Sequence, residues 1–351
     1  MKYKNGQVIY KYSLKTKIGE GAFGSVWLAT DLALNSEVAV KLLDQTEFSL
    51  DERLFEAQIG NRLKHPNVIS LNGADIATID GNSIVIISMP YYSNGSIVSQ
   101  ANKRNFINLK NAIKCVIDIL CGLEYLHENG YYHCDIKPNN ILIGDRGEYI
   151  LSDYGIACHS SNFGGVEPTD VYHPHIAPEI ISDFRHDRRT DIYQTGITAF
   201  RLINGLSLIK DEFLINIQAF ERDVSQGRII TDAKYQWFVP RSIKRVINKA
   251  VDPNPDKRYQ TALEMRRSLE KIYLIGDCTT DEEGNLIVFN DHYSYVHSIT
   301  KKYNGCFDLD VYKISSNTKR ETRCSKYCLS NLHNKELKAN LQRFFQEIIR
   351  G

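Results

Sequence analysis

The residues best suited to chemistry lie in one short segment, 133–140, which reads HCDIKPNN. Asp135 supplies a carboxylate, Lys137 an ammonium group and Asn140 an amide. A second carboxylate, Asp153, follows thirteen residues after Asn140. Phosphoryl transfer needs such a set: oxygen ligands for Mg²⁺, a cation for the γ-phosphate, and a carboxylate beside the incoming hydroxyl. The pattern therefore predicts a magnesium- and ATP-dependent site with Asn140 and Asp153 as metal ligands.

A glycine-rich segment offers a second phosphate-binding feature. Gly19, Gly21 and Gly24 lie between two predicted strands, and glycines at this spacing let backbone N–H groups approach phosphate oxygens. The GxGxxG pattern is weak alone, and a following helix would indicate a dinucleotide fold. Here a strand follows, and Lys41 lies on the next one. A lone strand lysine is usually a solvated edge residue, but after a glycine loop it is well placed to hold phosphates.

The helix after that strand contains Glu56, for which two interpretations exist. It is either an ordinary surface glutamate or the carboxylate that pairs with Lys41 and holds its ammonium group toward the nucleotide.

The elements that must position these residues change character along the chain. The first hundred residues predict short strands and one helix, over 51–63, that HPN at 65–67 ends. After about residue 106 the pattern becomes helical. The predicted strands are 11–18, 25–30, 37–43, 84–89, 141–143 and 149–151, and the later predicted helices are 108–127, 190–204 and 240–251.

Composition narrows the class of protein. The 351 residues include 43 Lys and Arg against 42 Asp and Glu, a net charge of +1, which argues against a nucleic-acid or membrane-surface binder. The start contains no signal-peptide pattern, and no apolar run approaches the ~18 residues of a membrane helix. Eight cysteines without an export signal indicate reduced thiols and a cytoplasmic protein. We expect neither a nucleic-acid nor a membrane partner.

The segment 276–351, here called the accessory unit, differs in its sequence pattern from the helical region before it. Strand-like stretches after Gly284 lead to a closing amphipathic helix, which predicts a small α+β unit that binds a regulator or mediates self-association. Two metal-site alternatives are weaker. His173 and His175 form one candidate pair, but no third ligand is indicated. The other candidate is a zinc site, which lacks a second tight pair of ligands and comprises Cys306, Cys324, Cys328 and His333. The apolar stripe of the closing helix comprises Leu337, Leu341, Phe344, Phe345 and Ile348.

Over about residues 10–275 the chain resembles the eukaryotic-type protein kinases, most closely the Ser/Thr group. The glycine loop, the AVK lysine, the helix glutamate, an HxDxKxxN loop and a DxG motif occur in order. An APE motif at 177–179, a DxxxxG helix from Asp191 and a late arginine, Arg258, follow. The resemblance implies an α+β, two-lobed fold. Its parts would be a β-rich small lobe over about 10–89, a hinge over about 90–95 and a helical large lobe over about 96–275, before the accessory unit at 276–351.

The resemblance also implies roles for further residues. Glu179 would pair with Arg258, and Asp191 would hydrogen-bond the backbone of the catalytic loop. Adenine would be bound by a gatekeeper residue, by two hydrogen-bonding groups of the hinge and by apolar side chains on the two faces of its ring, here called the sandwich. The gatekeeper is Met89, the hinge groups are the Pro90 carbonyl and the Tyr92 N–H, and the sandwich is Ile18, Val26, Ala39 and Leu142.

Three positions depart from the family pattern. Cys134 replaces the usual arginine, so a cation for an activation-segment phosphate is missing at this place. Tyr154 replaces phenylalanine in the metal motif and adds a hydroxyl that needs a partner. Tyr172 stands where Ser/Thr kinases keep a threonine beside the catalytic aspartate, which leaves the acceptor class open.

The resulting hypothesis is a kinase that transfers the γ-phosphate of MgATP to Ser/Thr hydroxyls of protein substrates, itself included. A pseudokinase scaffold is one alternative, but it predicts loss of Lys41, Asp135 or Asp153, and all three are present. A small-molecule kinase is another, but APE, the DxxxxG helix and Arg258 are typical of the lobe that binds protein substrates. The sequence leaves the substrate, the pathway and the oligomeric state open.

Overall fold

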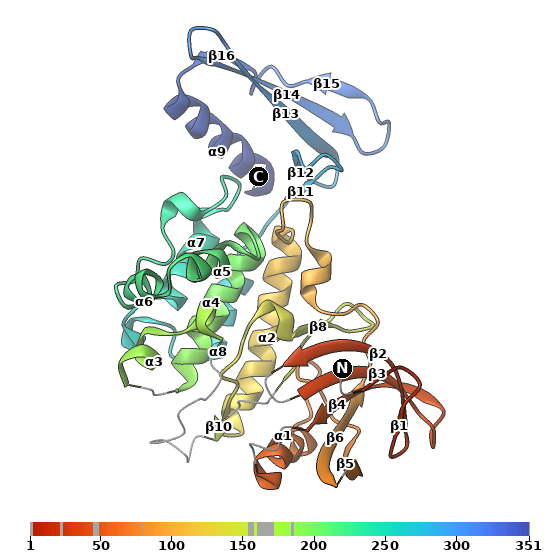
Figure 1. Ribbon diagram of the computed structural model, residues 1–351. Helices are drawn as coiled ribbons and strands as arrows, with labels where there is room; N and C mark the ends of the chain where they lie inside the picture. The colour runs from red at the N-terminus through yellow and green to blue at the C-terminus, as the bar shows by residue number, and fades with distance from the viewer. Residues whose placement is uncertain are drawn as a thin grey trace.

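The computed structural model has three parts: a sheet-rich lobe, a helical lobe and a β-rich unit with one long helix (Figure 1). The residues that it describes are 3–21, 24–44, 49–79, 81–153, 158–159, 172–183 and 186–350. Within these ranges it does not describe some side chains, including that of Glu56.

The small lobe is an antiparallel sheet of six strands in the order β1-β2-β3-β4-β6-β5, with one helix, α1, against it. Alternation along β4 places Val38 and Val40 in the core on one face, so Ala39 and Lys41 point to the other. Strand β5 escaped the sequence prediction because it is a mostly exposed edge strand. The bounds are β1 (Val8–Ile9), β2 (Tyr12–Gly21), β3 (Gly24–Asp31), β4 (Ser36–Leu43), α1 (Leu50–Arg62), β5 (Gly73–Ile79) and β6 (Asn82–Pro90).

The large lobe is built around two long buried helices, α2 and α4. The apolar face predicted for α2 is buried except at Ile117, which is partly buried, and β7 and β9, from two short two-stranded sheets, contact the helix. The bounds are α2 (Leu109–Glu128), β7 (Tyr131–Tyr132), β8 (Ile141–Ile143), β9 (Tyr149–Leu151), β10 (Cys158–His159), α3 (Pro178–Asp183), α4 (Arg188–Asn204), α5 (Leu208–Ile215), α6 (Ile217–Ser225), α7 (Arg241–Ala250) and α8 (Ala262–Glu270).

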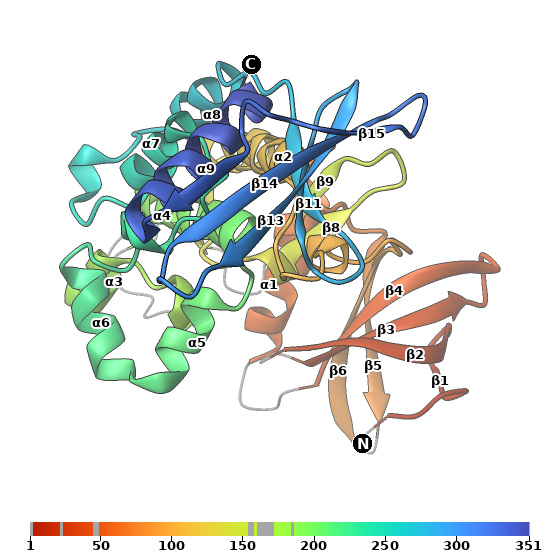
Figure 2. The same ribbon diagram turned by 90° about the horizontal axis from the view of Figure 1, so that it is seen from above.

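The accessory unit is a twisted antiparallel sheet in the order β11-β12-β13-β14-β15, with β16 also paired to β14 and α9 packed on one face (Figure 2). The whole predicted apolar stripe of α9 is buried. Phe344 contacts the rings of Tyr295 and Tyr327. The bounds are β11 (Asp277–Thr280), β12 (Leu286–Phe289), β13 (Tyr293–Lys301), β14 (Phe307–Ser315), β15 (Glu321–Arg323), β16 (Leu329–Leu332) and α9 (Asn334–Arg350).

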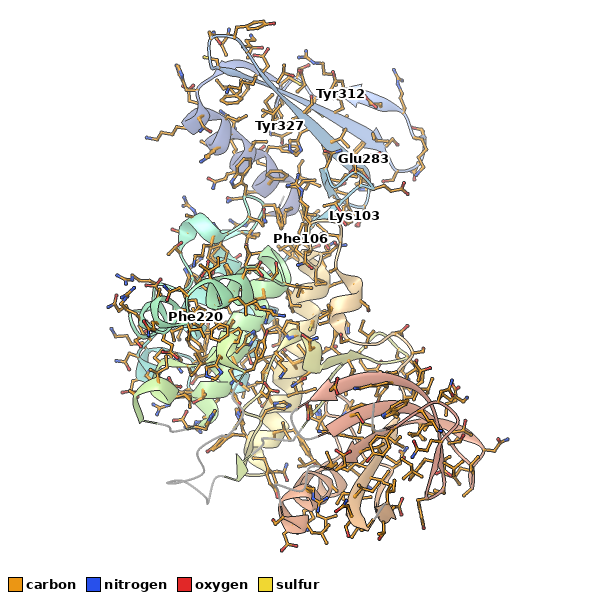
Figure 3. All side chains as sticks on the ribbon, viewed as in Figure 1. Lys103, Phe106, Phe220, Glu283, Tyr312 and Tyr327 are labelled. Carbon is orange, nitrogen blue, oxygen red and sulfur yellow. The ribbon has the colours of Figure 1, made fainter. Side chains whose placement is uncertain are left out.

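The accessory unit and the large lobe share one apolar core. Phe345 of α9 packs edge-on against Phe238, with ring centroids 6.4 Å apart. Figure 3 shows Lys103 and Phe106 of the large lobe close to Glu283 of the accessory unit. The chain boundary near residue 276 remains a prediction, but the two sides of it are packed together.

A carboxylate of the accessory unit caps a large-lobe helix. Asp277 accepts hydrogen bonds from the backbone N–H groups of Leu109, at 2.7 Å, and Lys110, at 3.2 Å, where α2 begins. These N–H groups have no partner within the helix. The start of α2 is therefore completed by a residue more than 160 positions later in the chain.

Two further findings concern membrane helices and metal sites among the residues that the structure describes. Within the described parts of the chain, no helix has the length and apolar character to cross a membrane. The same residues contain no group of three His, Cys, Asp or Glu side chains placed to hold a metal ion. No such group therefore occurs among the described residues around Cys324 and Cys328 or around His173 and His175.

Candidate active site

The three candidate side chains of segment 133–140, Asp135, Lys137 and Asn140, lie together. Lys137 Nζ lies 2.6 Å from Asp135 Oδ2. Asn140, which ends the short 3-10 helix η2 (Pro138–Asn140), donates from Nδ2 to the same oxygen at 2.9 Å. Asp135 is thus oriented from two sides. The amide of Asn140 uses its nitrogen for this contact, which turns its oxygen, the atom that can bind a metal, away from Asp135.

Asp191, buried in the first turn of α4, holds the backbone of this loop. Its carboxylate accepts from the N–H groups of His133, at 2.9 Å, and Cys134, at 2.8 Å. His127 Nε2 lies 2.8 Å from Oδ2 of the same carboxylate. Burial would raise the pKa of Asp191, but the hydrogen bonds, that of His127 first, lower it. The expected contact of Asp191 with the loop backbone is confirmed.

Gln194, one turn along α4, adds a support that the sequence analysis missed. It accepts from Ile136 N at 3.0 Å and donates to Cys134 O at 2.8 Å. Cys134, whose carbonyl oxygen accepts this bond, has a backbone in the left-handed region, with φ 67°. A polar side chain inside the apolar helix 190–204 was the signal that could have revealed this role.

Asp153 and Lys41 meet between the two lobes. Lys41 Nζ lies 2.7 Å from Asp153 Oδ1. Partial desolvation would raise the pKa of Asp153, but Lys41 outweighs it and lowers the pKa to about 2. Asp153 is therefore an ionised oxygen donor at neutral pH, as a Mg²⁺ ligand must be. The side chain of Glu56, the proposed partner of Lys41, lies outside the described residues.

The glycines of the glycine-rich segment lie at the end of β2 and the start of β3. Gly21 pairs with Gly24, and Gly19 pairs with Val26. Gly24 has φ 151°, and a Cβ built there would lie only 1.9 Å from the backbone oxygen of Leu42. Only glycine fits at this position, which lets the turn lie close over β4.

The residues predicted to surround adenine come from both lobes. Ala39 and Met89 are paired across β4 and β6, and Pro90 ends β6. Leu142 lies in β8 of the large lobe, where Ser96 forms a bridge to it. Ile18 and Val26 lie on β2 and β3, and Tyr92 follows β6. Contacts of these residues with adenine remain predictions.

Glu179 and Arg258 form the ion pair that the resemblance implied. Arg258 Nη1 lies 2.7 Å from Glu179 Oε1, and Nη2 lies 2.8 Å from Oε2. Arg258 is fully buried and also donates to Asp252 O at 2.7 Å. This bidentate pair joins the start of α3 to the segment before α8.

A family model, described as the protein kinase domain, matches residues 12–270. This chain belongs to the protein kinase family. The kinase is 28% identical over 268 residues to CBL-interacting protein kinase 5 of rice (Oryza sativa subsp. japonica). It is also 28% identical over 272 residues to serine/threonine-protein kinase PrkC of Bacillus subtilis.

These alignments cover 74% and 75% of the kinase but only 55% and 40% of the two relatives. With PknB of Mycobacterium tuberculosis, the identity is 27%, over 75% of the kinase and 43% of that relative. The chain therefore spans about half the length of the curated relatives that it matches.

Of the three departures from the family pattern, two are described. Cys134 is buried in the catalytic loop of the kinase, with its Sγ 3.7 Å from Tyr132 O, and it supplies no cation. Tyr172 lies at the start of the short 3-10 helix η4 (His173–His175), near Lys137. Tyr154 lies outside the described residues. So do Ser160, Ser161 and Thr169, the serine and threonine hydroxyls of the segment from Asp153 to Glu179, which the resemblance makes the activation segment.

Proposed function

We propose that the protein transfers the γ-phosphate of MgATP to Ser/Thr hydroxyls of protein substrates, itself among them. The observation that carries this proposal is the cluster of Asp135, Lys137 and Asn140, in which Lys137 and Asn140 both lie within hydrogen-bonding distance of the Asp135 carboxylate. Family membership supports ATP as the phosphate donor and protein as the acceptor. The named Ser/Thr kinases among the relatives favour that acceptor class.

Each proposed role follows from the chemistry of the side chain. Asp135 orients the acceptor hydroxyl and takes its proton, and Lys137 neutralises charge on the transferred phosphoryl group. Lys41 binds the phosphates that follow adenine. Asp153 and Asn140 supply the oxygen atoms suited to Mg²⁺, which neutralises phosphate charge when bound. Fixed groups of this kind contribute to the rate by positioning and by electrostatics.

The place of action and the partners stay predictions. A cytoplasmic location follows from the cysteine content alone, and protein substrates follow from the family. We propose that the accessory unit binds a regulator or mediates self-association, because the matched kinase region ends at residue 270 and the unit lies at the end of the large lobe away from the small lobe.

The proposed function is tested by incubating the purified protein with MgATP, alone and with a cell lysate. Site-resolved mass spectrometry should find new phosphoserine and phosphothreonine in the protein and in lysate proteins. An Asp135→Asn sample is the matched control and should add almost none. Protein that binds ATP yet adds no phosphate to any hydroxyl would contradict the proposal.

Control of activity gives a further prediction. A phosphate on the activation segment usually pairs with an arginine in the catalytic loop, and the buried thiol of Cys134 cannot supply that contact. We therefore expect the triple change of Ser160, Ser161 and Thr169 to Ala to alter initial rates on an added substrate by less than about threefold, ~0.7 kcal/mol. A tenfold loss that acidic replacements restore would show instead that phosphorylation is the main switch.

A further inference from the structure

The aromatic ring of Tyr172 lies against the ammonium group of Lys137. Lys137 Nζ is 4.8 Å from the centroid of the ring, within the range of a cation–π contact. The same ammonium lies 2.6 Å from Asp135 Oδ2. Lys137 is therefore held between a carboxylate and a ring face, although its four-carbon side chain is intrinsically flexible.

A buried pair supports Tyr172 from behind. The ring centroids of Tyr172 and His175 are 5.3 Å apart, and Arg201 Cζ lies 5.8 Å from the Tyr172 centroid. Arg201 and His175 are both buried, and Arg201 Nη1 lies 2.7 Å from His175 Nε2. Because a guanidinium group can only donate, Nε2 accepts, and the ring proton lies on Nδ1.

That proton ties the pair to the catalytic loop. His175 Nδ1 lies 2.7 Å from the carbonyl oxygen of Ile136, the residue between Asp135 and Lys137. Burial, followed by the charge of Arg201, keeps the pKa of His175 well below its usual range, so the ring stays neutral. The backbone that carries both functional side chains is thus fastened to the same cluster that positions Tyr172.

The arginine of this cluster is committed to internal contacts. Besides His175, Arg201 donates from Nε to Leu206 O at 2.7 Å, and its side chain is buried. An anion-binding role for Arg201 would require it to leave both partners. The arrangement instead suits a fixed support.

We propose that Tyr172 is a positioning residue for Lys137, in that its ring face holds the ammonium beside Asp135 for phosphoryl transfer. This inference rests on the proposed function. It assigns the tyrosine that departs from the family pattern to the same catalytic step, through the ring rather than through a hydroxyl. A side chain without a π face would leave Lys137 to sample other rotamers.

The test compares Tyr172→Phe, which keeps the ring, with Tyr172→Leu, which removes it, in the full chain. At saturating MgATP and acceptor, we expect the single-turnover rate of Tyr172→Leu to fall about tenfold, ~1.4 kcal/mol. Tyr172→Phe should stay within about twofold, and the KM for ATP should change little in either. His173→Leu, in the same short helix but stacked on Phe213, is the matched control and should keep the full rate.

A second readout does not depend on activity. In protein whose lysines carry ¹³C-methyl groups, the signal of Lys137, assigned with Lys137→Arg, should be shifted by the ring current in wild type and in Tyr172→Phe. The shift should vanish in Tyr172→Leu. If wild type adds no phosphate, the proposed function fails, and this signal still decides whether the contact exists. Equal rates in Tyr172→Phe and Tyr172→Leu, or a wild-type signal without the shift, would overturn the inference.

Discussion

Replacing Asp135 with asparagine is expected to lower phosphoryl transfer by ~10²-fold or more while ATP still binds. Asparagine has the size of aspartate, so the loop backbone held by Asp191 should keep its conformation. The amide cannot take the proton of the acceptor hydroxyl, and it lacks the charge that pairs with Lys137 at 2.6 Å. Initial rates and ATP affinity, measured on the same preparation, check both halves of the expectation.

Asp153→Asn provides the comparison variant. Its carboxylate is the proposed metal ligand, so this change should weaken Mg²⁺-dependent ATP binding as well as transfer. The two variants are therefore expected to differ in their affinity for ATP in the presence of Mg²⁺, although both lose phosphoryl-transfer activity. Full activity in purified Asp135→Asn protein would show that the role assigned to Asp135 is wrong.

Removing residues 277–351 is expected to yield insoluble or unstable protein. From the sequence alone, a folded kinase should survive this cut, with exposed apolar surface if the accessory unit packs on the large lobe. The structure shows that packing: the cut would uncover Phe106 and Phe238 and remove the Asp277 carboxylate from the start of α2. Uncovered apolar surface of this kind favours aggregation.

A graded variant and a control accompany the truncation. Phe345→Ala, in the full chain, removes one fully buried ring at this junction and should lower the free energy of unfolding by about 3–5 kcal/mol. Tyr303→Ala, at a fully exposed position of the same unit, should leave it unchanged. Thermal melting and ATP binding are the measurements. A truncated chain that melts cooperatively at the wild-type temperature would show that the two units are independent.

The part of the site that could be predicted lies close together in the sequence. Asp135, Lys137 and Asn140 occupy one loop, and their types already specify the chemistry. The ion pair of Glu179 with Arg258 joins distant residues and was reached only through the family resemblance. The strand alternation of β4 was also readable, because buried valines alternate with the positions of Ala39 and Lys41.

Most supports of the site could not be predicted, for a physical reason. His127 lies on α2, His175 on η4, and Gln194 and Arg201 on α4, and apart from the polar Gln194 their positions in the sequence carry no signal of contact with the loop. Only the fold brings them to the loop. The packing of the accessory unit on the large lobe could not be predicted either, because nothing in the sequence distinguishes Phe238 from any other buried apolar residue.

The cap that Asp277 places on α2 also constrains the order in which the protein can assemble during synthesis. The N–H groups of α2 leave the ribosome 168 residues before the carboxylate that satisfies the first of them. Domains generally fold as units, from the N-terminus onward, as the chain emerges. A nascent chain that already holds every residue proposed for catalysis therefore still lacks the side chain that caps the first turn of α2. The large lobe reaches its finished packing only after α9 (Asn334–Arg350) has been synthesised and closes against it.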